Sequence, residues 1–156
     1  MRMASTVLED LADRAMKFDD NTGNCIREII MDNDGYILGF NTDVQLYGLG
    51  ENRLGVSIMD YMPYSVWTMD VKTKKGQPCN RVTLHDEGDF HRSFYIEADN
   101  EQFEIKASDW KTDALTEKYG KEILGLNDGH RMEVAWDYLY PELLEKLRSA
   151  LQMPPN

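Results

Sequence analysis

A polar run of four residues, Asp32-Asn33-Asp34-Gly35, separates two short apolar segments, Cys25–Met31 and Tyr36–Phe40. Both segments contain β-branched or aromatic residues, which are enriched in strands. Gly35 can adopt the positive φ that a tight turn requires. The pattern therefore predicts a β-hairpin over residues 25–40.

Three more strand-like segments follow later in the chain: Asn80–Leu84, His91–Ala98 and Gln102–Ser108. Polar, turn-prone runs separate them, and this spacing is typical of an antiparallel meander. Together with the hairpin, the meander predicts an α+β fold. We expect a five-stranded antiparallel sheet with short helices on one side, flanked by N- and C-terminal helices.

The flanking helices have recognisable signals. Thr6 and Glu9 have the spacing of a capping box, which predicts a first helix over Thr6–Phe18. The turn-forming residues after Phe18 should end that helix. Further helices are expected over Ser65–Val71 and Asp113–Leu124, and a last one begins at Pro141.

Length and composition favour one domain. A chain of 156 residues with 42% hydrophobic residues can build a single core. No internal repeat or linker-like composition divides it. The expected single domain, residues 1–156, has an N-terminal helix and turn (1–24), a core (25–110) and a C-terminal helical extension (111–156).

The formal charge of −11 restricts the possible partners. It repels phosphate backbones, so direct binding of DNA or RNA is not expected. The densest basic segment, Lys72-Thr73-Lys74-Lys75, is interpreted as a turn that carries solvated charge. An acidic surface suits a basic protein partner.

The sequence predicts a cytoplasmic protein that does not enter a membrane. The N-terminal residues lack the apolar core of a signal peptide, and no window is apolar enough for a membrane helix. Cys25 and Cys79 form no Cys-x-x-Cys pair, which favours free thiols in a reducing compartment.

The first half of the predicted core resembles a PAS domain over about Ile26 to Asp60. The resemblance rests on a strand, an Asp-Gly turn, a strand that ends in Asn, spaced glycines, and a Gly-x-Ser before an acidic residue. These features correspond to Asp34-Gly35, Asn41, Gly48, Gly55-Val56-Ser57 and Asp60. The three later strands agree with the family in number and order.

The resemblance implies a sensory or interaction module with a ligand between the sheet and the short helices. It also implies a homodimer formed through one face of the first helix, here Val7, Leu8, Leu11 and Ala15. The motifs of the flavin-linked and haem-linked subfamilies are missing, so we predict no cofactor. A small apolar ligand remains possible, bound by Tyr61, Tyr64, Trp67 and Met69, although such residues also form ordinary cores.

The run from His85 to His91 concentrates imidazoles and carboxylates, which are ligands for divalent metals. A metal site at His85, Asp86 and His91 and a solvated polar turn are the two alternatives here. The run Asp32–Ile37 imitates the middle of a calcium loop, but Ile30 and Asn41 stand where ligands are needed, which excludes that site.

No nucleophile elbow or phosphate-binding loop occurs in the sequence. We therefore expect a non-enzymatic sensory or binding module that signals by docking to a protein partner, by binding a small ligand or by dimerisation. The alternative is an acidic partner-blocking protein, such as an immunity protein or a phage-type inhibitor, with a basic target. A small metal-dependent enzyme that uses His85, Asp86 and His91 is the third hypothesis.

Overall fold

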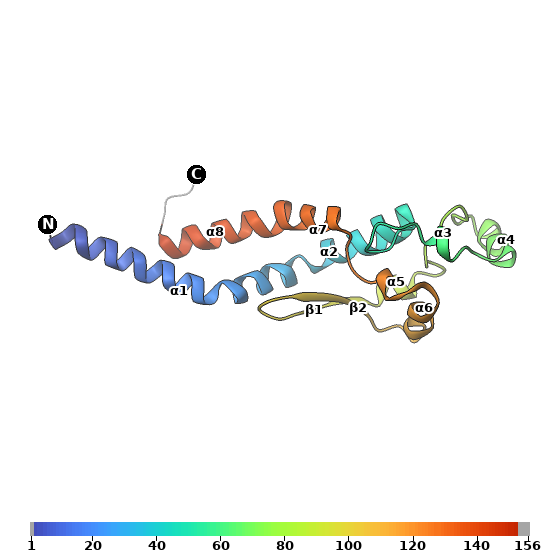
Figure 1. Ribbon diagram of the computed structural model, residues 1–156, viewed down its shortest axis with the longest axis horizontal. Helices are drawn as coiled ribbons and strands as arrows, with labels where there is room; N and C mark the ends of the chain where they lie inside the picture. Colours follow the sequence, from blue (N-terminus) through green and yellow to red (C-terminus); the bar gives the residue numbers. More distant parts are fainter. Residues whose placement is uncertain (1, 153–156) are drawn as a thin grey trace. The chain divides into compact units, whose positions relative to one another are not determined.

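The computed structural model describes residues 2–152, with side chains from residue 6 onward, and most of this chain is helical (Figure 1). The chain divides into two compact units. Unit 1 comprises Met1–Asn33, Ala98–Phe103 and Glu133–Asn156, and unit 2 comprises Asp34–Glu97 and Glu104–Met132. Within residues 2–152, no helix is long and apolar enough to cross a membrane.

Unit 1 is built on two long helices, α1 (Arg2–Asp32) and α8 (Tyr140–Leu151), the latter preceded by the π-helical segment η3 (Ala135–Leu139). The helices lie side by side in antiparallel directions (Figure 1). Arg14 donates a hydrogen bond to the carbonyl of Leu151, whereas Asn33 donates to the carboxylate of Glu142 at 2.8 Å. The buried side chains of α1, at Cys25, Ile29 and Ile30, and that of Asn33 directly after it follow helical spacing.

The prediction that the first helix ends after Phe18 is wrong, because the turn-forming residues satisfy one another inside the helix. Thr22 donates its hydroxyl to the Phe18 carbonyl, and Asn24 donates to the Asn21 side chain, both at 2.9 Å. Gly23 forms no turn, and its lack of a side chain is required by packing. A Cβ there would lie 2.7 Å from the carbonyl oxygen of Asn100, so glycine lets the 98–103 segment approach α1 closely.

Unit 2 begins with α2 (Asp34–Gly39), the π-helical segment η1 (Phe40–Leu49), α3 (Ile58–Tyr61) and α4 (Val66–Lys74). It continues through α5 (Asp89–Arg92), β1 (Phe94–Ala98) and β2 (Phe103–Ala107). It ends with α6 (Thr112–Tyr119), the 3₁₀ turn η2 (Lys121–Ile123) and α7 (Asp128–Val134), whose last residues belong to unit 1.

The five-stranded sheet is wrong. Among the described residues one sheet forms, and it contains only the two strands β1 and β2. The predicted hairpin over residues 25–40 is helical because its buried residues recur every four positions, at Cys25, Ile29, Asn33 and Ile37. The third predicted strand, Asn80–Leu84, forms no strand. The PAS-like α+β architecture is therefore replaced by a mostly helical one.

Several predicted elements are confirmed. The hairpin of β1 and β2 has its turn at Asp99, whose carboxylate accepts from the amides of Glu101 and Gln102. α4 begins after Ser65, whose hydroxyl accepts from the Thr68 amide as an N-cap does. Pro141 lies in the first turn of α8. The π-helical turns of η3 directly precede it, where the missing proline amide would interrupt regular α-helical bonding.

Two fully buried amide side chains, Asn41 and Gln45, connect η1 to the segment 123–127. Asn41 donates to the Ile123 carbonyl and accepts from the Gly125 amide, at 3.2 and 2.8 Å. Gln45 donates to the Gly125 carbonyl and accepts from the Asn127 amide, both at 2.9 Å. The two side chains thus satisfy backbone groups that a neighbouring strand would otherwise have to pair.

We expect Gln45→Met to destabilise the protein by about 2–4 kcal/mol. The methionine keeps the length of the side chain but leaves the buried Gly125 carbonyl and Asn127 amide without their partner. Urea unfolding followed by circular dichroism measures the change. The exposed neighbour Val44 provides the control, since Val44→Ala should change the free energy of unfolding by less than about 0.5 kcal/mol. Equal effects of the two substitutions would contradict this role of Gln45.

Candidate functional site

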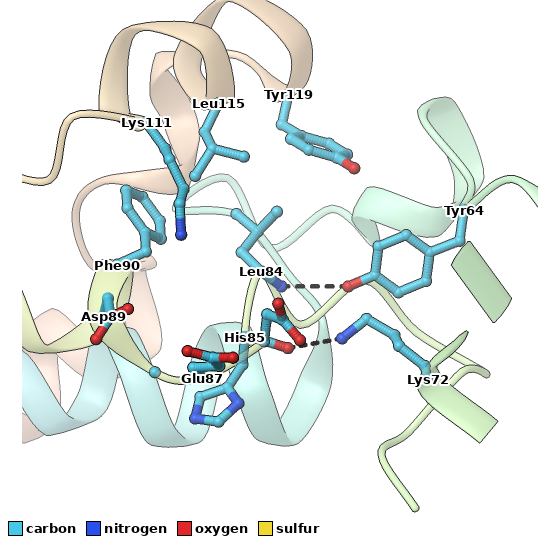
Figure 2. A pocket seen from close by; sticks show the side chains of 12 residues that line it. Tyr64, Lys72, Leu84, His85, Glu87, Asp89, Phe90, Lys111, Leu115 and Tyr119 are labelled. Carbon is cyan, nitrogen blue, oxygen red and sulfur yellow. Dashed lines mark hydrogen bonds between the residues drawn. The ribbon is translucent and has the colours of Figure 1, made fainter. Parts of the chain in front are cut away.

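Unit 2 contains a cavity of about 170 Å³ between α6 and the loop that leads into α5 (Figure 2). Leu115 and Tyr119 reach it from α6, and Lys111 extends toward Leu84 and Phe90. The remaining lining residues come from α4 and its approach and from the loop itself: Tyr64, Lys72, His85, Asp86, Glu87, Gly88 and Asp89. The cavity therefore has aromatic and aliphatic walls with charged groups of both signs.

Lys72 is the buried cation of the cavity wall, with 7% of its surface exposed. Its ammonium donates to the His85 carbonyl at 2.6 Å, and more weakly to Gln77 Oε1 and Thr83 Oγ1. It also lies 5.1 Å from the centre of the Tyr64 ring. The expectation that the lysine-rich segment is a solvated turn is wrong for Lys72. Its side chain is buried and its ammonium binds the backbone of the loop that leads into α5.

Other side chains hold the same loop through its backbone. The Tyr64 hydroxyl accepts from the amides of Thr83 and Leu84, at 2.9 and 3.3 Å. The Asp86 carbonyl accepts from Gln77, and the Glu87 carbonyl accepts from Arg92. These bonds fix the loop in one conformation although it belongs to no helix or sheet.

Leu84 is held in a strained backbone conformation at the centre of the cavity, with a φ of 52°. A non-glycine residue in this region is uncommon and costs roughly 1 kcal/mol or more. The Tyr64 hydroxyl holds this position through hydrogen bonds from the amides of Leu84 and of Thr83 before it. Strain of this kind persists where the surrounding contacts over-determine it, and it is concentrated at binding and active sites.

The carboxylates at the mouth of the cavity are largely neutralised by neighbours outside it. Asp86 pairs with Lys75, and Asp89 pairs with Arg92. The hydrogen bond from Lys75 lowers the pKa of Asp86, and the charges of Lys75, Lys72 and Lys111 lower it further. In the described part of the chain, the ion pairs include neither Lys72 nor Lys111.

Two of the three predicted metal ligands lie together. The His85 and His91 rings are 5.2 Å apart in an edge-to-face arrangement, and a ring nitrogen of His91 lies 2.9 Å from the Thr83 carbonyl. Asp86 turns to Lys75 instead. Figure 2 shows the His85 ring on the side of the loop away from α6. Across the described residues, no three side chains of His, Cys, Asp or Glu gather closely enough to hold a metal ion.

His91 is half-buried, and its desolvation, together with the charge of His85, lowers its pKa to about 4. A neutral His91 must donate its Nε2 proton to the Thr83 carbonyl, which fixes its tautomer. Nδ1 of His85 is buried without a hydrogen-bond partner. His91 is therefore a neutral, packed side chain beneath the loop at physiological pH.

The predicted ligand-binding residues are dispersed. Tyr64 lines the cavity, whereas Tyr61 donates its hydroxyl to the Tyr119 carbonyl at 2.8 Å. Trp67 and Met69 lie on α4 and are exposed. The sequence did not point to Lys72, Leu84, Phe90, Lys111, Leu115 and Tyr119, which lie far apart along the chain. No sequence pattern marks these residues as one site, since each of them also fits an ordinary core or surface position.

The predicted dimer residues, Val7, Leu8, Leu11 and Ala15, are all exposed on the N-terminal part of α1. Beyond them, α1 and α8 border a groove of about 540 Å³. Phe18, Cys25 and Ala150 supply its apolar part, and Glu28, Glu142 and Glu145 supply carboxylates. Unit 1 therefore presents apolar surface and negative charge together.

The comparisons give no relative: no known family model, curated protein or solved structure matches this chain. The resemblance to PAS domains is therefore wrong, since neither a family match nor the expected sheet supports it.

The lowered pKa of His91 predicts a loss of stability in acid. Between pH 6.5 and 4 the unfolded imidazole binds a proton that the folded one does not, so the free energy of unfolding falls as the pH falls. Since one pKa unit corresponds to about 1.4 kcal/mol, the contribution is roughly 3 kcal/mol. His91→Gln keeps a donor for the Thr83 carbonyl but cannot titrate in this range.

Urea unfolding at pH 7, 5.5 and 4.5 tests this expectation. The wild type should lose more stability than His91→Gln over this range, and the difference should grow steadily below about pH 6.5. Parallel pH profiles for the two proteins would show that His91 is not buried as a neutral ring.

Proposed function

We propose that this chain is a non-catalytic protein-binding module that captures a basic protein partner through unit 1. The observation that carries the proposal is the exposed apolar face of α1. Val7, Leu8 and Leu11 are all accessible to solvent on this helix, and Leu8 is 66% exposed. Exposed apolar side chains clustered on one helix are typical of interaction sites.

This part of α1 extends beyond the contact with α8. Arg14 binds the carbonyl of Leu151, the last residue of α8. The residues before it, from Arg2 to Asp13, form roughly 18 Å of helix at about 1.5 Å per residue. A helical segment this short is marginal in water without tertiary packing. A partner that covers the apolar face would stabilise it.

Charge favours a basic partner over a second copy of the chain. Unit 1 contains 13 acidic and 6 basic side chains, a formal charge of −7. Two copies would repel each other, whereas a basic surface would be attracted and guided to the site. The carboxylates of Glu28, Glu142 and Glu145 at the groove lie on the same unit. Of the hypotheses drawn from the sequence, the partner-blocking one is the one that has a basic target.

A designed helical peptide tests the proposal, with leucines on one face and lysines on the other. We expect calorimetry to show binding that weakens as salt is added, because ionic screening reduces the attraction. The double variant Leu8→Glu and Leu11→Glu should lose at least tenfold in affinity, since about 1.4 kcal/mol corresponds to tenfold. Val66→Glu is the matched control, because Val66 is equally apolar and 85% exposed but lies in unit 2.

Three results would contradict the proposal. The first is equal binding of a peptide with glutamates in place of the lysines, and the second is unchanged binding by the double variant. The third comes from sedimentation of the free chain: a wild-type dimer that the double variant converts to a monomer would identify a second copy as the partner. A monomeric wild type that binds the basic peptide supports the proposal.

A further inference from the structure

The size of the unit 2 cavity restricts what it can hold. An apolar cavity of about 150 Å³ holds one benzene molecule. The cavity above the 84–90 loop has a volume of about 170 Å³. It therefore matches a molecule with a single ring, and Leu84, Phe90 and Leu115 provide apolar walls for it.

The charges around the cavity select an anion. The two ammonium groups of its lining, Lys72 and Lys111, stand outside every ion pair of the described residues. The charges of both contribute to lowering the pKa of Asp86, so their fields reach the mouth of the cavity. A buried cation without a carboxylate partner is costly, and an anion in the cavity would offset that cost.

The two lysines differ in what they can do. The Lys72 ammonium already donates to Gln77, Thr83 and His85, so it acts through its charge. Figure 2 shows Lys111 extending from the α6 side toward the space between Phe90 and Leu84, where its ammonium can meet a ligand directly. The Lys111 ammonium lies 5.5 Å from the centre of the neighbouring Trp110 ring.

The acidic groups of the lining oppose an anion only weakly. Asp86 and Asp89 are paired with Lys75 and Arg92. Glu87 is exposed, so water and salt screen its carboxylate, whereas the buried Lys72 is screened much less. The net field inside the cavity is therefore positive.

We propose that the unit 2 cavity binds a small, single-ring organic carboxylate. The ring lies against Leu84, Phe90 and Leu115, the carboxylate accepts hydrogen bonds from Lys111, and the fixed charge of Lys72 supports it. The strained Leu84 backbone, held by Tyr64, keeps the apolar wall in place for the ring.

Three probes with the same ring and different charge test the proposal on the full-length chain: benzoate, benzamide and benzylamine. We expect calorimetry at neutral pH to show benzoate binding, benzamide binding about tenfold more weakly, and no binding of benzylamine. Lys111→Met should reduce benzoate affinity about tenfold. Lys121→Met is the matched control, because Lys121 is exposed and outside the lining, and it should leave affinity unchanged.

Two further variants locate the site. Leu115→Trp should fill the cavity and abolish benzoate binding, and Asp86→Asn should strengthen it by removing a competing negative charge. Absence of benzoate binding, equal affinity for benzoate and benzamide, or preferred binding of benzylamine would each overturn the proposal. Preference for benzylamine would mean that the carboxylates of the cavity lining, and not its lysines, determine which ligand charge the cavity binds.

Discussion

The hydrogen bonds of Asn41 and Gln45 to the segment 123–127 determine the arrangement of unit 2. Each of these two buried side chains donates to one backbone carbonyl and accepts from one backbone N–H. Together they make the hydrogen bonds that a short neighbouring strand would otherwise make. Tyr61 adds a bond to the Tyr119 carbonyl just before this segment. The chain that follows α6 is thereby fixed, and with it the position of Leu115 and Tyr119 above the cavity.

The loop below the cavity follows the same principle. Its carbonyls accept from Lys72, Gln77, His91 and Arg92, and its amides donate to the Tyr64 hydroxyl. A buried backbone group without a partner is costly, and sheets normally remove that cost. In this unit side chains remove it instead, which explains how a cavity wall can be built from irregular chain. The same hydrogen bonds hold the backbone of Leu84 in its strained conformation.

These polar contacts also explain which parts of the structure the sequence could predict. α4, α8 and the β1–β2 hairpin have local signals, such as the Ser65 cap, Pro141 and the Asp99 turn, and they were predicted correctly. The helical structure over residues 19–41 was missed because buried polar residues, including Asn33 and Asn41, resemble breaks in an apolar pattern. The sequence does contain a four-residue spacing of these positions. Only the structure shows that the Asn side chains at these positions are buried.

The site was predictable to a smaller extent for a related reason. His85 and His91 are close in sequence, so their proximity could be anticipated. Lys72 and Lys111 are separated by a hairpin and several turns, and nothing local indicates that α4 and α6 face one cavity. A lysine in a basic run resembles a solvated charge, and its burial depends on carbonyls that the fold brings to it.

Charge is distributed unevenly over this acidic chain. Unit 1 carries most of the excess negative charge on half-covered helices, whereas the lining of the unit 2 cavity includes, beside its carboxylates, two ammonium groups that lack carboxylate partners among the described residues. Salt screens exposed charges beyond about 8 Å at physiological ionic strength. The anion that we propose for the cavity would therefore respond chiefly to the nearest cations, Lys72 and Lys111. The proposed basic partner would contact many exposed carboxylates at once, so it would respond to the summed field of unit 1.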